Sequence, residues 1–273
     1  MKISKTLYIR YLFTLLLPLS GLLQACDMIE YHPYDLDIDG ETEVNARNIQ
    51  RIETALDGKK EFSFAVISDT QRWYDETEDA VADMNEKGGI DFVVHTGDLS
   101  DFGMKLEFEK QRDILNGLSV PYVCLLGNHD CLATGKEAFN RIFGEENFSF
   151  TAGDVLFICL NTNALEFDYS DAIPDFSFLE KLLKNLSPDI RRTIVAMHAG
   201  PYSEQFNNNV ARVFQLYLRQ FPGLQFCVYG HSIQVNDFFD DGILYYECTC
   251  AKKRAYLRFT LKENEYLYEV VNY

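Results

Sequence analysis

Five short apolar runs in this chain each lead into aspartate, asparagine or histidine, and this pattern constrains the fold more than any other feature. The runs are FSFAVIS before Asp69, DFVVHT before Gly-Asp98, YVCLLG before Asn128, TIVAM before His198 and FCVYG before His231. A single such strand end would mean little, because Asp and Asn are common in turns. Five of them indicate one site, since ligands collect at the carboxyl ends of strands in open α/β sheets.

Stretches with helical character lie between several of these runs. Helices are expected at residues 46–56, 104–115, 176–186 and 210–221, and another from a capping pattern at Asp75 and Glu78 to a stop at Gly88. Strands that alternate with helices are typical of α/β folds with right-handed crossovers. The segments YLRFTL and YLYEVV flank a polar turn at residues 262–265, which predicts a β-hairpin. A chain of 273 residues, 47% of them hydrophobic, can form one large domain.

The first 25 residues have the organisation of a secretory signal. A basic start precedes an apolar stretch over residues 11–23, which is shorter than the roughly 20 residues of a membrane-spanning helix. The segment LQAC, which ends at Cys26, resembles the lipobox of bacterial lipoproteins, in which the cysteine becomes the lipidated first residue. We therefore expect lipidation of Cys26 and a cell-envelope location, anchored to a bacterial membrane on its periplasmic side or at the surface. An ordinary signal peptide and an uncleaved anchor are the alternatives.

An acidic segment follows the expected lipidation site. Residues 27–45 contain seven acidic and no basic residues, which indicates a solvated tether. We therefore expect a signal peptide at 1–25, a lipidated cysteine with tether and lead-in helix at 26–60, and a domain at 61–273. Removal of residues 1–25 takes away three positive charges and no negative one, so the formal net charge changes from −17 to −20. Such a charge disfavours binding to nucleic acid.

The residues at the five strand ends have the chemistry of a divalent metal site. Asp, Asn and His form an oxygen and nitrogen set that suits Mn, Fe, Zn or similar ions, unlike a cysteine-rich structural zinc site. Glycines at positions 97, 127 and 230 each directly precede one of these residues and allow a sharp turn close to an ion or a phosphate. The alternative is strand-end capping, or a core histidine in the case of His198.

The same segments resemble the motifs of the calcineurin-like metallophosphoesterase family. In chain order, the segments are SDTQ, GDLSD, GNHD, MHAGPY and YGHS. The corresponding motifs of the family, in the same order, are Asp-x-His, Gly-Asp-x-x-Asp/Asn, Gly-Asn-His-Asp/Glu, a lone His and Gly-His-x-His. Asp69, Asp98 and Asn128 are separated by 29 and 30 residues, in agreement with that pattern. The resemblance extends from about Phe62 to Tyr256. It implies an α/β fold of two mixed β-sheets packed as a sandwich with flanking helices, in four layers αββα.

The resemblance also implies a pair of metal ions, with Asp98 bridging them. One site would comprise Asp98, Asn128, His198 and His231, and the other Asp69, Gln71, Asp98 and the second histidine of the last motif. The chain departs from the family twice, because Gln71 replaces a histidine and Ile233 stands where the second histidine belongs. A short deletion after His231 explains the second departure equally well. We expect one well-formed site and a second, weaker site that suits Mg or Mn better than Zn.

By this resemblance the chain would be a metal-dependent phosphoesterase that hydrolyses phosphomonoesters or small phosphodiesters by attack of a metal-bound hydroxide. His129 would be the general acid for the leaving group, with Asp130 as its orienting partner. The expected partners are a small phosphate ester and, through the lipid anchor, a membrane, but not nucleic acid. The alternative is a catalytically weakened or inactive single-metal binding lipoprotein of the same fold.

Other polar residues near these motifs have less certain roles. His95 lies inside a strand run and is interpreted as structural. Arg72 is interpreted as a surface residue, although its guanidinium could reach a phosphate oxygen. Asn163, Tyr202 and Glu204 are expected to line the pocket, because they lie close to the motif strands in the sequence.

Overall fold

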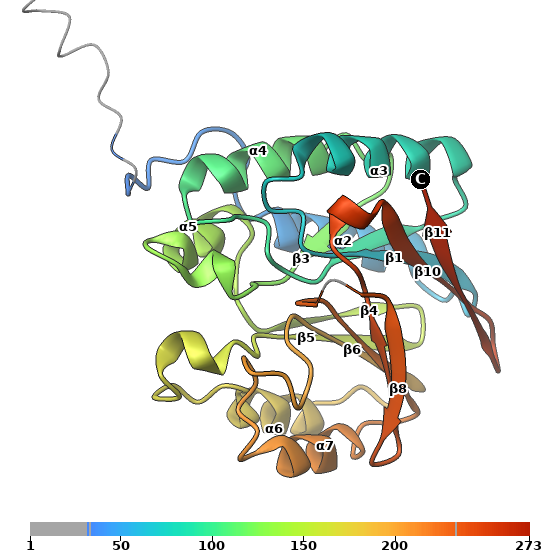
Figure 1. Ribbon diagram of the computed structural model, residues 1–273. Helices are drawn as coiled ribbons and strands as arrows, with labels where there is room; N and C mark the ends of the chain where they lie inside the picture. Colours follow the sequence, from blue (N-terminus) through green and yellow to red (C-terminus); the bar gives the residue numbers. More distant parts are fainter. Residues whose placement is uncertain (1–31, 33, 233) are drawn as a thin grey trace, which may run out of the picture. The chain divides into compact units, whose positions relative to one another are not determined.

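The computed structural model of this chain describes residues 32, 34–232 and 234–273 (Figure 1). The expected signal peptide, Cys26 and Ile233 lie outside the described residues. The chain divides into two compact units, residues 1–35 and residues 36–273, and all elements below belong to the second. Within the described ranges, none of the helices has both the length and the apolar composition needed to cross a membrane.

A five-stranded mixed sheet is built from both ends of the second unit, in the order β11-β10-β1-β2-β3 (Figure 1). β1, β2 and β3 are parallel, whereas β10 is antiparallel to both β1 and β11. The predicted C-terminal hairpin is therefore confirmed as β10 and β11. The bounds are β1 Phe62–Ile67, β2 Phe92–His95, β3 Tyr122–Cys124, β10 Ala255–Leu261 and β11 Tyr266–Asn272.

A six-stranded mixed sheet has the order β4-β5-β6-β7-β9-β8. Its inner strands β5, β6, β7 and β9 are parallel, and the antiparallel strands β4 and β8 close the two edges. The bounds are β4 Phe148–Ala152, β5 Val155–Leu160, β6 Arg192–Met197, β7 Leu224–Tyr229, β8 Asn236–Asp240 and β9 Ile243–Glu247.

The two sheets pack face to face through a core rich in phenylalanine. Phe157 of the six-stranded sheet makes edge contacts with Phe64 and Phe92 of the other, at ring-centroid distances of 5.2 and 5.3 Å. Phe226 stacks on Phe259 across the same interface at 4.6 Å. Each aromatic pair of this kind stabilises the fold by about 0.5–1.5 kcal/mol beyond the burial of its area. The two mixed sheets expected from the family resemblance are confirmed.

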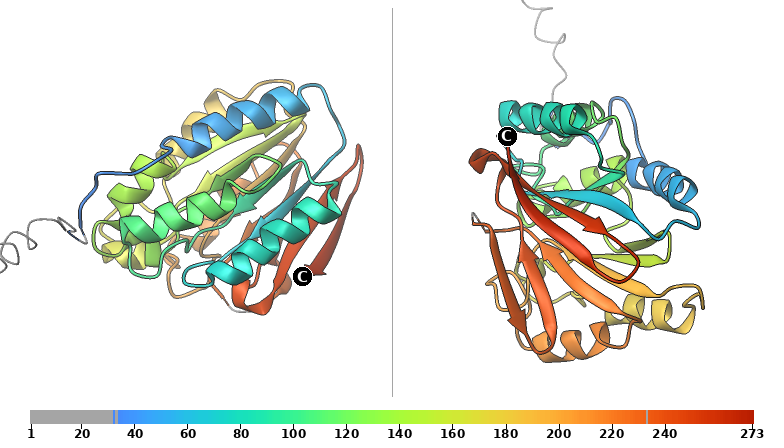
Figure 2. Two further views of the ribbon diagram at one scale, coloured as in Figure 1. Left: turned by 90° about the horizontal axis from the view of Figure 1, so that it is seen from above. Right: turned by 90° about the vertical axis from the view of Figure 1, so that its right-hand side faces the viewer.

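Helices cover the outer faces of the two sheets (Figure 1, Figure 2). Buried side chains of α3, α4 and α5 form one apolar cluster with the outer face of the five-stranded sheet. Those of α6 and α7 form another with the outer face of the six-stranded sheet, which completes the four layers. The bounds are α3 Tyr74–Lys87, α4 Lys105–Leu115, α5 Gly135–Ile142, α6 Phe176–Lys184 and α7 Ala211–Leu218, and the short 3-10 turns are η2 His129–Cys131, η3 Ala164–Phe167 and η4 Ala251–Lys253.

Helix α2 (Val44–Leu56) makes the second unit begin earlier than the domain boundary expected at residue 61. Ile52 and Leu56 are buried in the core between the sheets. The side chain of Asn45 donates to the carbonyl of Cys124 in β3 and accepts from its N–H, each at 2.8 Å. Residues 36–56, which the sequence grouped with the tether, are therefore packed into this unit.

Several elements differ from the sequence prediction. Helix α5 and strands β4, β8 and β9 were not predicted. Helix α3 begins at Tyr74, and no side chain caps its N-terminus. The expected cap at Asp75 is therefore wrong, because Asp75 lies in the first turn of the helix. There its negative charge still interacts favourably with the N-terminal end of the helix.

Candidate metal centre

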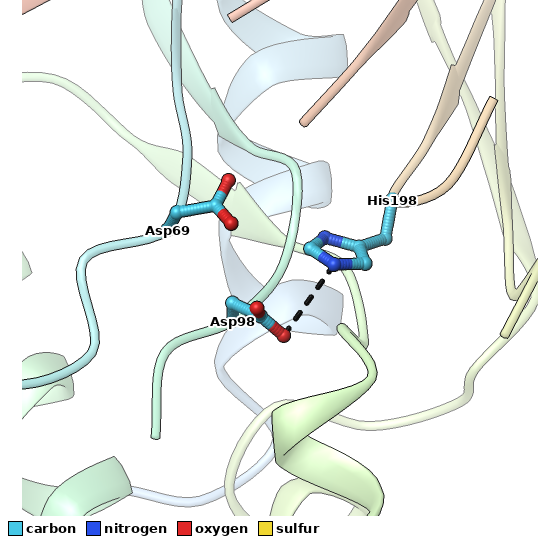
Figure 3. A group of neighbouring side chains, drawn as sticks. All are labelled: Asp69, Asp98 and His198. Atoms are coloured by element: carbon cyan, nitrogen blue, oxygen red, sulfur yellow. Dashed lines mark ion pairs between the residues drawn. The ribbon is translucent and has the colours of Figure 1, made fainter. Parts of the chain in front are cut away.

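The polar residues after five strands meet at one edge of the sandwich, as the sequence pattern predicts. Asp69, Asp98 and Asn128 follow the parallel strands β1, β2 and β3, while His198 and His231 follow the parallel strands β6 and β7. Asp69, Asp98 and His198 are buried, and one ligand atom from each lies within 4.8 Å of the others (Figure 3). The carboxyl ends of strands from both sheets thus supply a single cluster of metal-binding side chains.

The ring of His198 presents an unprotonated nitrogen to this cluster. Its Nδ1 lies 2.9 Å from the carbonyl oxygen of Thr96, which can only accept, so Nδ1 carries the hydrogen. Burial lowers the pKa of His198 to about 4, which keeps the ring neutral. Its Nε2 therefore directs a lone pair at Asn128 Oδ1, 3.0 Å away, and at Asp98 Oδ1, 3.4 Å away. Lone pairs that face one another in this way fit a bound cation.

The ring of His231 completes the same arrangement. Its Nε2 lies 3.0 Å from the carboxylate of Glu204, so the hydrogen is on Nε2. The lone pair of Nδ1 then points at Asn128 Oδ1, 3.0 Å away. The rings of His198 and His231 lie edge to face with their centroids 5.2 Å apart. The residues expected for the complete site therefore offer two ring nitrogens, an amide oxygen and a carboxylate to one ion, a set that suits a divalent transition metal.

Glu204 positions His231, and we expect its removal to weaken metal binding. Outer partners of this kind fix the tautomer and orientation of a metal-binding histidine, and their loss lowers metal affinity by roughly 10–100-fold. Glu204→Ala should show this loss for Mn²⁺ in isothermal titration calorimetry. Glu204→Gln should retain most of the affinity, because its amide oxygen can still accept from Nε2. Glu263→Ala, a loss of the same charge in the exposed β10–β11 turn, is the matched control. Unchanged affinity in Glu204→Ala would contradict the positioning role.

Asp69 and Gln71 make a less complete ligand set, as expected for the second site. The carboxylate of Asp69 accepts hydrogen bonds from the hydroxyl of Ser68 and, at 3.1 Å, from the N–H of His231. The side-chain N–H of Gln71 donates to Asp98 Oδ2 at 3.1 Å, so its amide hydrogen faces the cluster. The position of the missing histidine, Ile233, lies outside the described residues.

The buried carboxyl groups of the cluster are electrostatically suited to a cation. Burial, followed by the neighbouring carboxylate of Asp130, raises the pKa of Asp98 to about 8. Burial also raises the pKa of Asp69 to about 6, although His198 opposes this shift. Such shifts mean that the ionised carboxylates are poorly solvated by their surroundings. A divalent cation between them would supply the missing stabilisation.

The backbone at the centre is turned into the left-handed region at four non-glycine residues. The φ angles are 52° at Asp69, 29° at Gln71, 60° at Asp98 and 76° at His231. This conformation costs of order 1–3 kcal/mol at each such residue and is concentrated at functional sites. Here it turns each polar side chain away from the line of its strand and toward the cluster.

The three glycines singled out in the sequence have two different functions. Gly97 has a φ of 106°, a conformation that favours glycine. Gly127 and Gly230 have ordinary φ angles but allow close contact. A Cβ at Gly127 would overlap the backbone and carboxylate of Asp98, and one at Gly230 would overlap Ser68 and approach the carboxylate of Asp69.

Asp130 holds two site loops together rather than orienting His129. Its fully buried carboxylate accepts four backbone N–H bonds and one hydroxyl bond. The donors are the N–H groups of Asp98, Leu99, Ser100 and Gly127 and the hydroxyl of Ser100, at 2.7–3.2 Å. The expected contact with the ring of His129 is wrong, because the backbone of two loops uses the carboxylate oxygens.

The partner of His129 is Asp101, the last residue of the GDLSD segment. Nδ1 of His129 lies 3.0 Å from the carbonyl oxygen of Asp101 and 3.8 Å from its carboxylate, which also pairs with Arg72. Burial alone would lower the pKa of His129, but the Asp101 carbonyl and nearby carboxylates outweigh it and raise this pKa. The side chain is 39% exposed, so the ring is accessible from solvent. Arg72, with 58% of its side chain exposed, is a surface residue as expected.

His95 lies behind the centre and is structural, as its place in a strand suggests. It is fully buried at the end of β2, where Nδ1 accepts from the N–H of Gly97 at 3.1 Å. Its Nε2 therefore donates to the hydroxyl of Thr70, 2.9 Å away. Burial lowers the pKa of His95 to about 3, so the ring is neutral and both nitrogens are satisfied.

A pocket of about 430 Å³ opens beside His231. Tyr202 and Glu204 line it, as expected, whereas Asn163 is not among the lining residues. Asn163 is fully buried and donates to the carbonyl of Leu126 at 2.9 Å, so it supports the loop that leads to Asn128. Tyr229, Phe238 and Glu247 are among the lining residues that sequence reasoning missed.

A larger hollow of about 620 Å³ lies at the starts of strands, away from these five strand ends. Lys60, Arg192 and Glu263 are among its lining residues. Two of its cationic side chains are engaged, because Lys60 pairs with Glu263 and Arg192 pairs with Asp154, and none of the residues of the metal centre lines it. The smaller pocket beside His231 is therefore the better candidate for a substrate.

Comparisons with known proteins agree with this geometry. The family model for calcineurin-like phosphoesterases matches residues 62–235. A 3',5'-cyclic-nucleotide phosphodiesterase of Nostoc sp. (strain PCC 7120) is 28% identical over 153 residues, which cover 53% of this chain and 56% of that protein. The chain thus matches about half the length of this relative.

Two solved structures share the fold at low sequence identity. One, described as GAP50, the anchor in the inner membrane complex of Plasmodium, is 14% identical with a TM-score of 0.59, and the match covers 78% of this chain and 85% of that one. The other, purple acid phosphatase PPD1 from yellow lupin (Lupinus luteus) seeds, is 13% identical with a TM-score of 0.58, and the match covers 78% of this chain and 51% of that one.

Proposed function

The chain belongs to the calcineurin-like phosphoesterase family, and from this premise we propose that it is a metal-dependent hydrolase of phosphomonoesters or small phosphodiesters. One observation carries the proposal. The unprotonated Nε2 of His198 faces two oxygen atoms, on Asn128 and Asp98, as ligand atoms around an ion do. A divalent cation would satisfy all three atoms at once, and a phosphate ester is the substrate class of the family.

The ligands for the ion come from both sheets. Asp98, Asn128, His198 and His231 would hold one ion, and Asp69 with Gln71 would hold a second, more weakly. When bound, such ions lower the pKa of a coordinated water to about 7 and stabilise charge on the phosphoryl oxygens. The chain itself supplies the fixed positions of these ligands, through the strand ends, the Asp130 hydrogen bonds and the contact between Glu204 and His231.

His129 would donate a proton to the leaving alcohol. Its Nδ1 is held by the carbonyl of Asp101, which leaves Nε2 directed outward from the ring. Its own N–H donates to Asp98 Oδ1 at 2.9 Å, which fixes the residue beside the metal ligands. A positioned general acid of this type contributes roughly 10²–10⁴-fold to a rate.

The relative named as a cyclic-nucleotide phosphodiesterase supports diesters as substrates. The match covers only about half of each chain, so it supports a class of bond rather than a particular nucleotide. Cyclic nucleotides therefore belong in the substrate panel beside simple monoesters and diesters. We propose that no nucleic acid is a substrate, because the formal net charge of −17 repels it.

The lipidated form would work in the cell envelope. The basic start, the apolar stretch and the LQAC segment that ends at Cys26 support a lipid anchor. The acidic residues between Cys26 and the second unit would keep the active site in water, at the end of a tether. Small phosphate esters of the envelope would be the accessible substrates.

A single-metal binding lipoprotein is the second candidate function. Gln71 supports it, because its side-chain N–H faces Asp98 where a metal-binding nitrogen is expected. Ile233 supports it further, because it offers no ligand atom. A protein with the same fold is described as an anchor in a membrane complex, which is compatible with a binding role for this candidate.

Metal-dependent turnover tests the first candidate against the second. We expect the purified metal-free protein to hydrolyse 4-nitrophenyl phosphate or bis(4-nitrophenyl) phosphate only after Mn²⁺, Mg²⁺, Fe²⁺ or Zn²⁺ is added. Elemental analysis should find one tightly bound ion per chain and a second that dialysis removes. One bound ion without turnover of any monoester, diester or cyclic nucleotide would support the binding role and overturn the hydrolase.

A further inference from the structure

The pocket beside His231 has walls from three parts of the six-stranded sheet. Tyr229 at the end of β7 and Phe238 of β8 lie edge to face with ring centroids 6.2 Å apart. Tyr202, in the loop after His198, is 54% exposed and adds a third ring. Its φ of 76° and the hydrogen bond from its N–H to Asn208 at 2.8 Å fix that loop at the rim. The pocket is thus an aromatic recess directly beside a metal ligand.

The charge of the pocket is negative. Two of its lining residues, Glu204 and Glu247, are acidic, and the described lining residues include no lysine or arginine. Glu247 is almost fully buried and accepts a hydrogen bond from the hydroxyl of Tyr229 at 3.0 Å. Glu204, with 73% of its side chain exposed, accepts from Nε2 of His231 at 3.0 Å. An organic group with a second phosphate or a carboxylate would meet repulsion here.

Aromatic rings combined with carboxylates are the surroundings that recognise alkylammonium cations. A cation over a tyrosine or phenylalanine ring is attracted by the ring face, most strongly where water is excluded, and carboxylates add a direct charge attraction. We propose that this pocket receives the organic group of the phosphate ester and selects esters whose organic group carries an alkylammonium cation. This inference rests on the proposed function, because it names the substrate class of the same site.

The position of the pocket fits this assignment. His231 is both a ligand of the metal centre and a lining residue of the pocket, so a phosphate bound at the metals has its substituent within reach of these walls. The phosphate would occupy the cationic part of the site and the ammonium group the anionic part. A volume of about 430 Å³ accommodates a group of the size of choline or ethanolamine.

Two ester pairs that differ only in charge test the proposal. In the diester pair, 4-nitrophenyl phosphorylcholine is compared with 4-nitrophenyl 3,3-dimethylbutyl phosphate, in which carbon replaces the ammonium nitrogen. In the monoester pair, phosphocholine is compared with 3,3-dimethylbutyl phosphate. We expect kcat/KM to favour the cationic member of a hydrolysed pair by about tenfold. Glu247→Gln and Phe238→Leu should each reduce this ratio severalfold. Glu263→Gln, an equal charge change outside the pocket, should leave the ratio unchanged.

Binding of choline alone, measured by calorimetry, gives a readout that does not depend on turnover. We expect binding to the native chain and weaker binding to Glu247→Gln. Equal turnover of the two members of each pair, or a preference for an anionic ester such as 3-phosphoglycerate, would overturn the charge selection while the hydrolase stands. If no ester is hydrolysed, the proposed function fails. The binding of choline, or its absence, then still decides whether the pocket recognises an alkylammonium cation. Should Glu247→Gln fail to fold, the native ratio and Phe238→Leu decide the question.

Discussion

Replacing Asp98 with asparagine should abolish metal-dependent hydrolysis while the fold is retained. The carboxylate lies 3.4 Å from Nε2 of His198 and belongs to the ligand sets proposed for both ions, so its replacement would remove a negative ligand from each. The loss should be well above the roughly 10–100-fold expected for a partner that only orients a metal ligand. Asparagine keeps the shape and can still accept from the N–H of His129, which Asp98 Oδ1 binds at 2.9 Å.

Metal content measured by elemental analysis should fall together with kcat/KM in Asp98→Asn. Asp189→Asn is the matched control, because this exposed aspartate precedes β6 at the opposite end of that strand from His198. Circular dichroism and the thermal unfolding midpoint check that both variants are folded. Full metal content with full activity in Asp98→Asn would show that the cluster of Asp69, Asp98 and His198 is not the reaction centre.

Much of the fold follows from local sequence patterns, and the exceptions have physical reasons. The strands that end in Asp, Asn or His are fully buried runs, such as β1 and β6, and these are easy to recognise. Strand β8, with the sequence NDFFD, is an edge strand that is largely exposed and carries acidic residues. Among the strands of the described residues it pairs with β9 alone, so its existence depends on a pairing that no local pattern reveals.

The metal ligands could be predicted because strand ends bring them together, whereas the supporting contacts could not. The family resemblance implied that His129 pairs with its sequence neighbour Asp130. The 3-10 turn η2 instead directs the carboxylate of Asp130 to the backbone around Ser100, while the ring of His129 faces Asp101. Adjacent residues in a tight turn point in different directions, so neighbourhood in sequence is a poor guide to side-chain contact.

Part of the wall of the pocket beside His231 could not be predicted for a related reason. Glu247 ends β9, which runs parallel to β7, so it reaches the same edge as Tyr229. The strand-end argument that found His231 would also have found Glu247, had β9 been predicted. Glu204 lies in a loop without regular structure, and only its contact with His231 shows what it does.

The second prediction with a large effect concerns His129, which we expect to act only where the leaving group needs a proton. His129→Ala should lower kcat/KM by roughly 10²–10⁴-fold for an alkyl phosphate, whose alkoxide is a poor leaving group. The loss should be much smaller for 4-nitrophenyl phosphate, because 4-nitrophenolate leaves without protonation. An effect on metal or phosphate binding would lower kcat/KM equally for both substrates. The ratio of the two decreases therefore reports proton transfer alone.

Asp101→Asn is the informative control for His129. It keeps the backbone carbonyl that holds Nδ1 and removes the carboxylate 3.8 Å away, together with the ion pair to Arg72. Without that carboxylate the protonated ring is less stabilised, so kcat/KM should again fall more for the alkyl ester than for the nitrophenyl ester. Both decreases should be smaller than in His129→Ala. Equal losses for both esters in His129→Ala would mean that this residue binds the phosphate rather than protonating the leaving group.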